Sequence, residues 1–275
     1  TGDTEALKFD QADLNATLKL DVKSMRDWIQ KSFADAKPTP PMSGSLEANI
    51  DIVKKANGEP WTAGFKLETQ DYRVEGILLD KVKTAGSWDG KSLYIPEATS
   101  ESRGSRFEIH ELRVAEGAVP EGDASQRAPW LMRIRKIKGH VELYEFMEDM
   151  GIGPIPMWMT ADGEFPCESQ LTPKFIFRCG GTFTGKNVVL QGELKHGRTA
   201  KKSIVAIPSF TSKADFTFDL DKFAYKAEIE MPNSKGSSSG EVYYKTGFNI
   251  KYEAEKLAIK DLDSLADLKI SGDLK

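Results

Sequence analysis

The sequence predicts a mostly β protein: a long, twisted antiparallel sheet with one apolar and one polar face, accompanied by two short helices. Three observations predict this fold. Short stretches of alternating apolar and polar residues follow one another along most of the chain, and Gly, Pro or Asn closes each of them. Helical spacing occurs only twice, over short stretches. No apolar run approaches the roughly 18 residues of a membrane-spanning helix.

The alternation in the first half of the chain is clearest between Gly44 and Ile109. Residues two apart in a strand point to the same side of the sheet, so each run predicts one apolar row. The strands expected up to this point are Leu18–Val22, Leu46–Ile52, Phe65–Thr69, Val74–Val82, Ser92–Pro96 and Arg106–Val114, with an earlier candidate at Ala6–Phe9. Thr99–Ser105 is expected to form a polar turn.

Two stretches change to helical spacing. The first is amphipathic, takes Ser24 as its N-cap and ends near Ala36, ahead of a Pro-rich link. Its apolar positions are Met25, Trp28, Ile29 and Phe33. The second is brief and ends at Gly151. Its apolar positions are Leu143, Tyr144, Met147 and Met150.

The second half of the chain is again a series of strands. The expected strands are Leu131–Val141, Phe175–Phe177, Asn187–Leu194, Ser203–Ile207, Ala214–Leu220 and Phe223–Met231. Met157–Met159 is expected to be an apolar link, and Asn233–Gly240 a flexible hairpin tip. The cleanest alternation, Glu241–Glu255, predicts a single strand that would extend roughly 45 Å, with a bulge near Glu255–Lys256.

Ala115–Ala128 has no periodicity and is rich in Gly, Pro and acidic residues, which indicates an exposed loop or a boundary. We therefore expect two units, residues 1–128 and 129–275, with the alternative that the second is continuous with the first. The order of strand, short helix, Pro-containing link and Gly-led strand occurs in both units. It recurs at one spacing, from Val22 to Val141 and from Gly44 to Gly163.

Charge and motifs argue against several classes of function. The formal net charge is -4, which does not suit a dedicated nucleic-acid binder with a basic stripe. The three histidines, His110, His140 and His196, are isolated in sequence and are expected to be exposed and without function, so no metal site is predicted. No pair of carboxylates stands out as an acid/base couple, and we expect a protein that is not an enzyme.

Cys167 and Cys179 are separated by turn signals that would place them in a hairpin or in neighbouring strands. A disulfide across this loop would contribute roughly 3 kcal/mol of stability in the chain-entropy model and would indicate an oxidising compartment, such as the periplasm or the secretory route. The alternative is a pair of buried thiols in a reduced protein.

The order of elements resembles the AsmA/TamB-like repeating β-groove proteins of bacterial envelopes. The stretches that carry the resemblance are Leu18–Ser45, Gly44–Ile50 (GSLEANI), Val74–Leu79 (VEGILL), Leu93–Pro96 with Gly104–Phe107, and Gly185–Leu194 (GKNVVLQGEL). The resemblance implies an open groove whose concave apolar face holds lipid acyl chains. It also implies phospholipid transfer between membranes without catalytic residues, a periplasmic or envelope location, and membrane-anchored envelope proteins as partners. The Cys pair and the length of Ala115–Ala128 depart from the family pattern.

We therefore expect the groove to be lined by the in-phase apolar residues of three stretches, which would otherwise form a dry core. These residues are Phe65, Leu67, Phe216, Phe218, Leu220, Val242, Tyr244, Phe248, Ile250 and Tyr252. The expected ligand is a phospholipid or another acyl-chain molecule, and no other cofactor is expected. The alternatives are a closed lipocalin-like β-barrel for a small apolar ligand and a structural or adhesion β-sandwich. Carbohydrate stacking on Trp61 or Trp88 is a further possibility.

Overall fold

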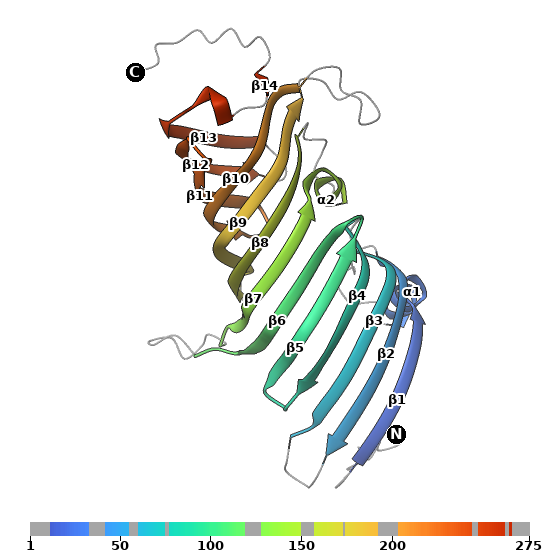
Figure 1. Cartoon of the computed structure of the whole chain (residues 1–275). Coiled ribbons are helices and arrows are strands. Elements are labelled where there is room, and N and C mark those ends of the chain that lie inside the picture. Colours follow the sequence, from blue (N-terminus) through green and yellow to red (C-terminus); the bar gives the residue numbers. More distant parts are fainter. Residues whose placement is uncertain are drawn as a thin grey trace.

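The computed structural model describes residues 12–32, 42–54, 60–74, 77–118, 128–149, 157–172, 174–191, 203–243, 247–261 and 264–265. They form one antiparallel sheet in which strands β1 to β13 lie side by side in sequence order (Figure 1). Each strand pairs with its sequence neighbours, and the short β14 (Ser264–Leu265) pairs with β10. The predicted mostly β fold is confirmed.

The strands have the following bounds: β1 Ala12–Asp21, β2 Met42–Lys54, β3 Thr62–Val74, β4 Ile77–Trp88, β5 Ser92–Ser102, β6 Ser105–Glu116, β7 Trp130–Glu142, β8 Met157–Gln170, β9 Ile176–Gln191, β10 Ser203–Phe218, β11 Lys222–Glu230, β12 Lys235–Tyr243 and β13 Gly247–Lys256. The helices are α1 (Val22–Ser32), α2 (Leu143–Asp149) and the 3₁₀ turn η1 (Ile259–Asp261).

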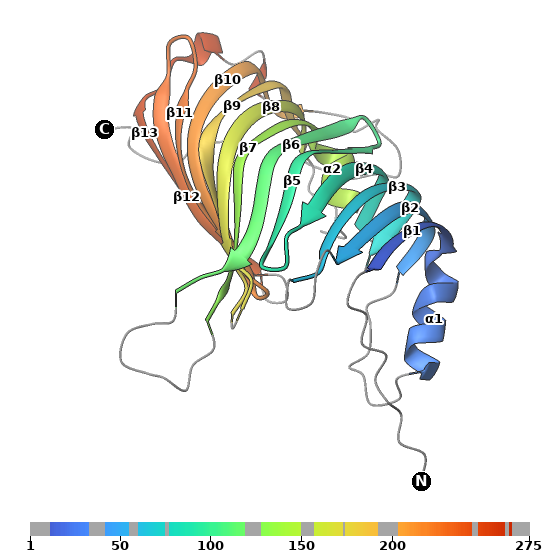
Figure 2. The ribbon, with the colours of Figure 1, turned by 90° about the horizontal axis from the view of Figure 1, so that it is seen from below.

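The sheet is open. β1 and β13 form its two edges and do not pair with each other, and the described residues contain no second sheet. The closed-barrel and sandwich alternatives are therefore wrong as descriptions of this fold. The sheet is also twisted and bent, so that the strands at its C-terminal end run across the direction of those at its N-terminal end (Figures 1 and 2). Each strand twists about its own axis, and the resulting rotation between neighbouring strands accumulates in this way over a wide sheet.

The register between strands gathers the apolar residues on one face. Ile50 lies opposite Ala16 on one side and Phe65 on the other, and the same matching of apolar rows continues to β13. The other face carries cross-strand ion pairs. These include Lys19–Glu47 at 3.1 Å, Lys83–Glu68 at 2.9 Å and Arg133–Glu168 at 3.2 Å. The pairs are exposed and contribute little to stability individually, but they keep this face wet.

The two helices follow β1 and β7 directly and pack near the strands on either side of them. Asp21, not Ser24, is the N-cap of α1, because its Oδ1 accepts the backbone N–H of Ser24 at 2.7 Å. A hydrogen bond with the Ser24 side chain and, next, this backbone hydrogen bond lower the pKa of Asp21. The predicted cap was wrong because Asp21, the last strand residue, already supplies the acceptor that a helix N-terminus needs.

The repeated order of elements is present as β1–α1–β2 and β7–α2–β8. The sheet continues across the expected boundary, since β6 pairs with β7 from Arg106↔His140 to Glu116↔Trp130. The division into units 1–128 and 129–275 stays a prediction.

The strand predicted over Glu241–Glu255 is wrong. Its described residues belong to two strands, the end of β12 and β13 up to Glu255, which pair antiparallel with Val242 opposite Phe248 and Gly240 opposite Ile250. In this register the even-numbered residues of β12 lie opposite even-numbered residues of β13. The apolar alternation therefore passes through the chain reversal without a change of phase, which hides the reversal in the sequence.

The predicted hairpin tip at Asn233–Gly240 is also wrong, because most of it belongs to β12, and the turn before it is Met231–Ser234. The predicted bulge is confirmed: Lys235 lies opposite Lys256 and Gly236 opposite Ala254, which leaves Glu255 as the extra residue.

Other predicted strand boundaries also differ from those of the structure. The two strands predicted at Phe175–Phe177 and Asn187–Leu194 lie, as far as they are described, mostly in the single strand β9, and those predicted at Ser203–Ile207 and Ala214–Leu220 lie mostly in the single strand β10; residues 192–194 are outside the described residues. Conversely, Val74–Val82 is split between β3 and β4. The apolar link at Met157–Met159 is the start of β8, and Val22 begins α1 rather than ending a strand. In Thr99–Ser105 only Arg103 and Gly104 form the turn.

Several predictions fall outside the described residues. These are the strand Ala6–Phe9, the helix position Phe33 with the helix end near Ala36, and Met150 with Gly151. Tyr244, His196 and most of the loop Ala115–Ala128 fall outside as well.

The core lies at the middle of the apolar face, where β6 to β10 meet. Its buried residues are Ile134, Ile137, Cys167 and Cys179. The half-buried residues that pack around them are Phe107, Ile109, Leu112, Met132, Phe165, Phe177 and Phe216. All of these come from one sheet, so the core is a single layer of side chains, not the interface of two layers.

Candidate functional site

Aromatic rings on the apolar face lie over glycines of the neighbouring strand. A Cβ added to Gly86 would come within 2.6 Å of Cζ of Phe65, and one added to Gly240 within 2.7 Å of Cε1 of Tyr225. Phe210 occupies the corresponding space over Gly185. A ring that fills the place of a missing side chain lies along the sheet instead of standing away from it. The apolar layer is therefore thin.

A hollow of about 120 Å3 lies on the apolar face across β6 to β10. Small residues form its floor and phenylalanine rings border it. The lining residues are Phe107, Gly139, Val141, Ala161, Gly163, Phe165, Gly181, Phe183, Ala214 and Phe216. Two of the rings meet edge to face, Phe165 and Phe216, with centroids 5.4 Å apart. Phe146 of α2 packs against Phe107, with ring centroids 5.8 Å apart, which places this helix at one end of the hollow.

The chain covers the apolar face only in part. Among the described residues, the largest side chains that are fully buried are Val22, Cys167 and Ser212, and no Leu, Phe, Tyr or Trp joins them. Toward the edges of the sheet the apolar side chains are open to solvent, with Leu14 55% exposed on β1 and Ile250 53% exposed on β13. A sheet face of this kind marks a surface that something else can cover.

The structure places the predicted lining residues in two groups. Phe65 and Leu67 lie on β3, whereas most of the others lie on β10, β12 and β13. In this second group Phe218 and Val242 both lie opposite Phe223, and Phe248 lies opposite Val242. Phe216 packs against the core, and Phe218 packs on Phe177 with ring centroids 4.6 Å apart. Ile250 and Tyr252 are half-exposed residues of the edge strand.

Two of the predicted residues are not placed on the face. Leu220 lies in the turn between β10 and β11 and is 78% exposed, so its expected position in the strand is wrong. Tyr244 is outside the described residues. Sequence reasoning also missed Phe107, Phe165 and Phe183. A signal existed, because Gly163–Phe165 and Gly181–Phe183 each put a glycine and an aromatic ring on the same face of one strand.

A disulfide joins Cys167 of β8 to Cys179 of β9. The two residues lie directly opposite each other, with Cα atoms 4.2 Å apart. They are 2% and 4% exposed, at the centre of the apolar face beside Ile134. The structure therefore has the disulfide rather than the pair of buried thiols.

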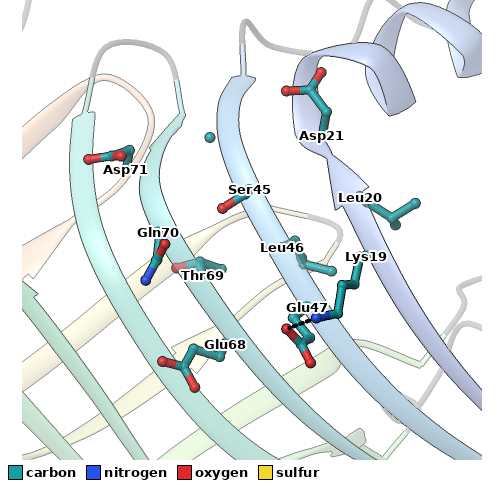
Figure 3. A pocket seen from close by; sticks show the side chains of 11 residues that line it. Lys19, Leu20, Asp21, Ser45, Leu46, Glu47, Glu68, Thr69, Gln70 and Asp71 are labelled. Carbon is teal, nitrogen blue, oxygen red and sulfur yellow. Dashed lines mark ion pairs between the residues drawn. The ribbon is translucent and has the colours of Figure 1, made fainter.

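A larger hollow, of about 700 Å3, lies at the helix end of β1 to β3 (Figure 3). It is open, and the side chains around it are mainly polar. They belong to Lys19, Leu20, Asp21, Ser45, Leu46, Glu47, Glu68, Thr69, Gln70 and Asp71, and Gly44 completes the lining. Lys19 and Glu47 pair with each other, and Thr69, a buried polar residue of the lining, accepts the backbone N–H of Val82 through its hydroxyl, so this hollow is a less suitable candidate than the apolar one.

The surroundings of the histidines and tryptophans differ from one residue to the next. His140 is not isolated, because its Nδ1 lies 2.7 Å from Oδ1 of Asp162 on the neighbouring strand. Within the described residues no group of three His, Cys, Asp or Glu could hold a metal ion. Trp88 packs against Trp130 with centroids 6.2 Å apart, whereas Trp61 is 42% exposed and has Lys54 over its ring.

No family model, curated protein or solved structure matches the chain. Among the described residues, no helix is long and apolar enough to cross a membrane.

Proposed function

We propose that this chain is a non-enzymatic lipid-binding module that holds acyl chains along the apolar face of its sheet. One observation carries the proposal: a single sheet presents one apolar face across its strands, and no second layer among the described residues covers it. The resemblance to the AsmA/TamB-like groove proteins, which was stated on sequence pattern alone, suggests the same activity.

The hydrophobic effect makes an acyl chain a suitable cover. Each methylene group buried against an apolar surface contributes about 0.8 kcal/mol. The hollow of about 120 Å3 equals about four water volumes, so it can take only a short segment of a chain. The rest of the ligand would lie along the thin apolar layer on either side of it, over the aromatic rings.

The setting of this activity follows from the disulfide. Stable disulfides form in oxidising compartments, so the periplasm or another part of the cell envelope is the proposed location. In that setting the ligand would be a phospholipid, and membrane-anchored envelope proteins would deliver or receive it. The module would form part of a lipid-transfer pathway between membranes.

The proposal is tested by measuring lipid that stays with the purified protein. The protein is purified without detergent, extracted into organic solvent, and the acyl lipids are counted per chain by mass spectrometry. Ala161→Glu puts a carboxylate at the hollow and should lower the lipid content several-fold, because a charge without a partner is costly to bury under an acyl chain.

The matched control is Thr182→Glu, which adds the same charge to the exposed polar side of β9, opposite Lys213. It should leave the lipid content unchanged. Circular dichroism establishes that both variants keep the sheet. A wild-type protein that carries no lipid and binds no fluorescent acyl probe would contradict the proposal, and so would equal loss of lipid in the two variants.

A further inference from the structure

The edge of the sheet at β13 is a surface whose outward backbone hydrogen-bonding groups have no strand partner among the described residues. β13 pairs with β12 on one side, and no described strand lies on its other side. Its apolar residues lean back onto glycines of β12: a Cβ on Gly236 would lie 2.9 Å from the hydroxyl of Tyr252, and one on Gly240 would lie 3.1 Å from Cγ1 of Ile250. Tyr252 is nevertheless 48% exposed and Ile250 53% exposed.

The described chain after β13 leads away from this edge. Asp261 of η1 anchors on the turn between β11 and β12, where its carboxylate accepts the backbone N–H of Asn233 at 2.9 Å and the hydroxyl of Ser234 at 2.6 Å. The next described residues, Ser264 and Leu265, pair with β10. Nothing in the described part of the chain therefore pairs with β13 on its outer side, although an edge with a long apolar row is a template for another strand.

We infer that β13 pairs antiparallel with β13 of a second copy of this chain. The charge pattern of the strand selects the partner and the register. With Tyr252 opposite Tyr252 of the other copy, Lys251 lies opposite the other copy's Glu253, and Glu253 opposite its Lys251. In the single chain Lys251 and Glu253 pair with each other at 2.6 Å, and both side chains are largely exposed. In the same register Ile250 lies opposite Ala254.

Symmetry supports an antiparallel pair of identical edges. A two-fold axis normal to the sheet keeps both apolar faces on the same side, so the apolar rows run on from one copy to the next. Pairing of β13 with β1 of a second copy in one continuous sheet would instead be parallel, since β1 and β13 run in the same direction in the meander. The self-pairing also closes after two copies, whereas a β13–β1 contact would continue without end.

The test is the mass of the purified chain in solution, measured by sedimentation at increasing concentration. A single pair of strands is a small interface, so we expect a dimer with a dissociation constant on the order of micromolar. Lys251→Glu and Glu253→Lys each place like charges opposite each other and should shift the equilibrium to monomer by about tenfold or more. A mixture of the two variants restores opposite charges and should form a heterodimer.

Cross-linking tests the register. Tyr252→Cys should form a disulfide between two copies under mild oxidation, because opposite residues lie about 4.5–5.5 Å apart. Glu253→Cys should not, since its counterpart is two register positions away. A chain that stays monomeric at all concentrations, or single variants that dimerise like wild type, would overturn the inference. The lipid content is a separate readout, so loss of the dimer leaves the proposed function standing.

Discussion

The disulfide between Cys167 and Cys179 should provide a large part of the stability of the sheet. We consider its reduction in the otherwise unchanged protein. The two residues are 12 positions apart, and a loop of that length corresponds to about 3 kcal/mol of unfolding free energy in the chain-entropy model. For a chain of this size, that change lowers the midpoint of thermal unfolding by about 6–12 °C.

The assay is urea unfolding, followed by tryptophan fluorescence, with and without a reducing agent. The oxidised protein should have the higher midpoint, and titration of free thiols in denaturant should find none. Cys167→Ala/Cys179→Ala should resemble the reduced protein, with a further small loss because both side chains are buried. If reduction leaves the midpoint unchanged, or if two thiols titrate in the untreated protein, the disulfide does not hold β8 to β9 and the argument for an oxidising compartment fails.

Two further predictions concern stability. Gly181→Ala should cost about 1–3 kcal/mol, because its Cβ would overlap the carbonyl oxygen of Glu164 and lie 2.5 Å from Cβ of Phe165, whereas Gly64→Ala meets open space and should not destabilise. Urea midpoints that fall equally in the two variants would contradict this. Burial raises the pKa of Asp261, but hydrogen bonds from the β11–β12 turn lower it more, so the folded pKa is below the ordinary 3.8. The contribution of Asp261 to folding stability is therefore complete above the ordinary pKa of 3.8 and is lost as the pH falls through the lower, folded pKa. Asp261→Asn should show a smaller loss of midpoint than wild type between about pH 6 and about pH 3, and equal losses would refute the assignment.

The sequence predicted the class of fold because alternation is a local signal. Phe65 to Thr69 show which side of a strand is apolar without knowledge of the neighbouring strands, and a series of such runs separated by turn residues predicts an antiparallel sheet. The chain reversal between Tyr243 and Gly247 was not predicted, because the register keeps the apolar alternation in phase. In addition, β12 is rich in Gly and Ser, and its β propensity is weak.

The candidate site was predictable only in part. Phe216 was chosen from its own row, but its ring contacts Phe165, which comes from a strand two positions away in the sheet. That meeting depends on the bend of the whole sheet and on the glycine at position 181 between them, and no local pattern carries it. The open state of the sheet was expected only from the resemblance, because it depends on whether β1 meets β13, and no local pattern carries that.

The order of the strands has a mechanical consequence. Among the described residues, and apart from the short β14, each strand pairs through backbone hydrogen bonds only with the strands adjacent to it in sequence. Under tension applied between the ends of the sheet, outer strands can therefore peel away one after another while the centre holds. Because the strands pair in sequence order, a hairpin can be inserted or duplicated without changing the pairing of the other strands. Repeat proteins, whose units interact with their nearest neighbours, lengthen in the same way.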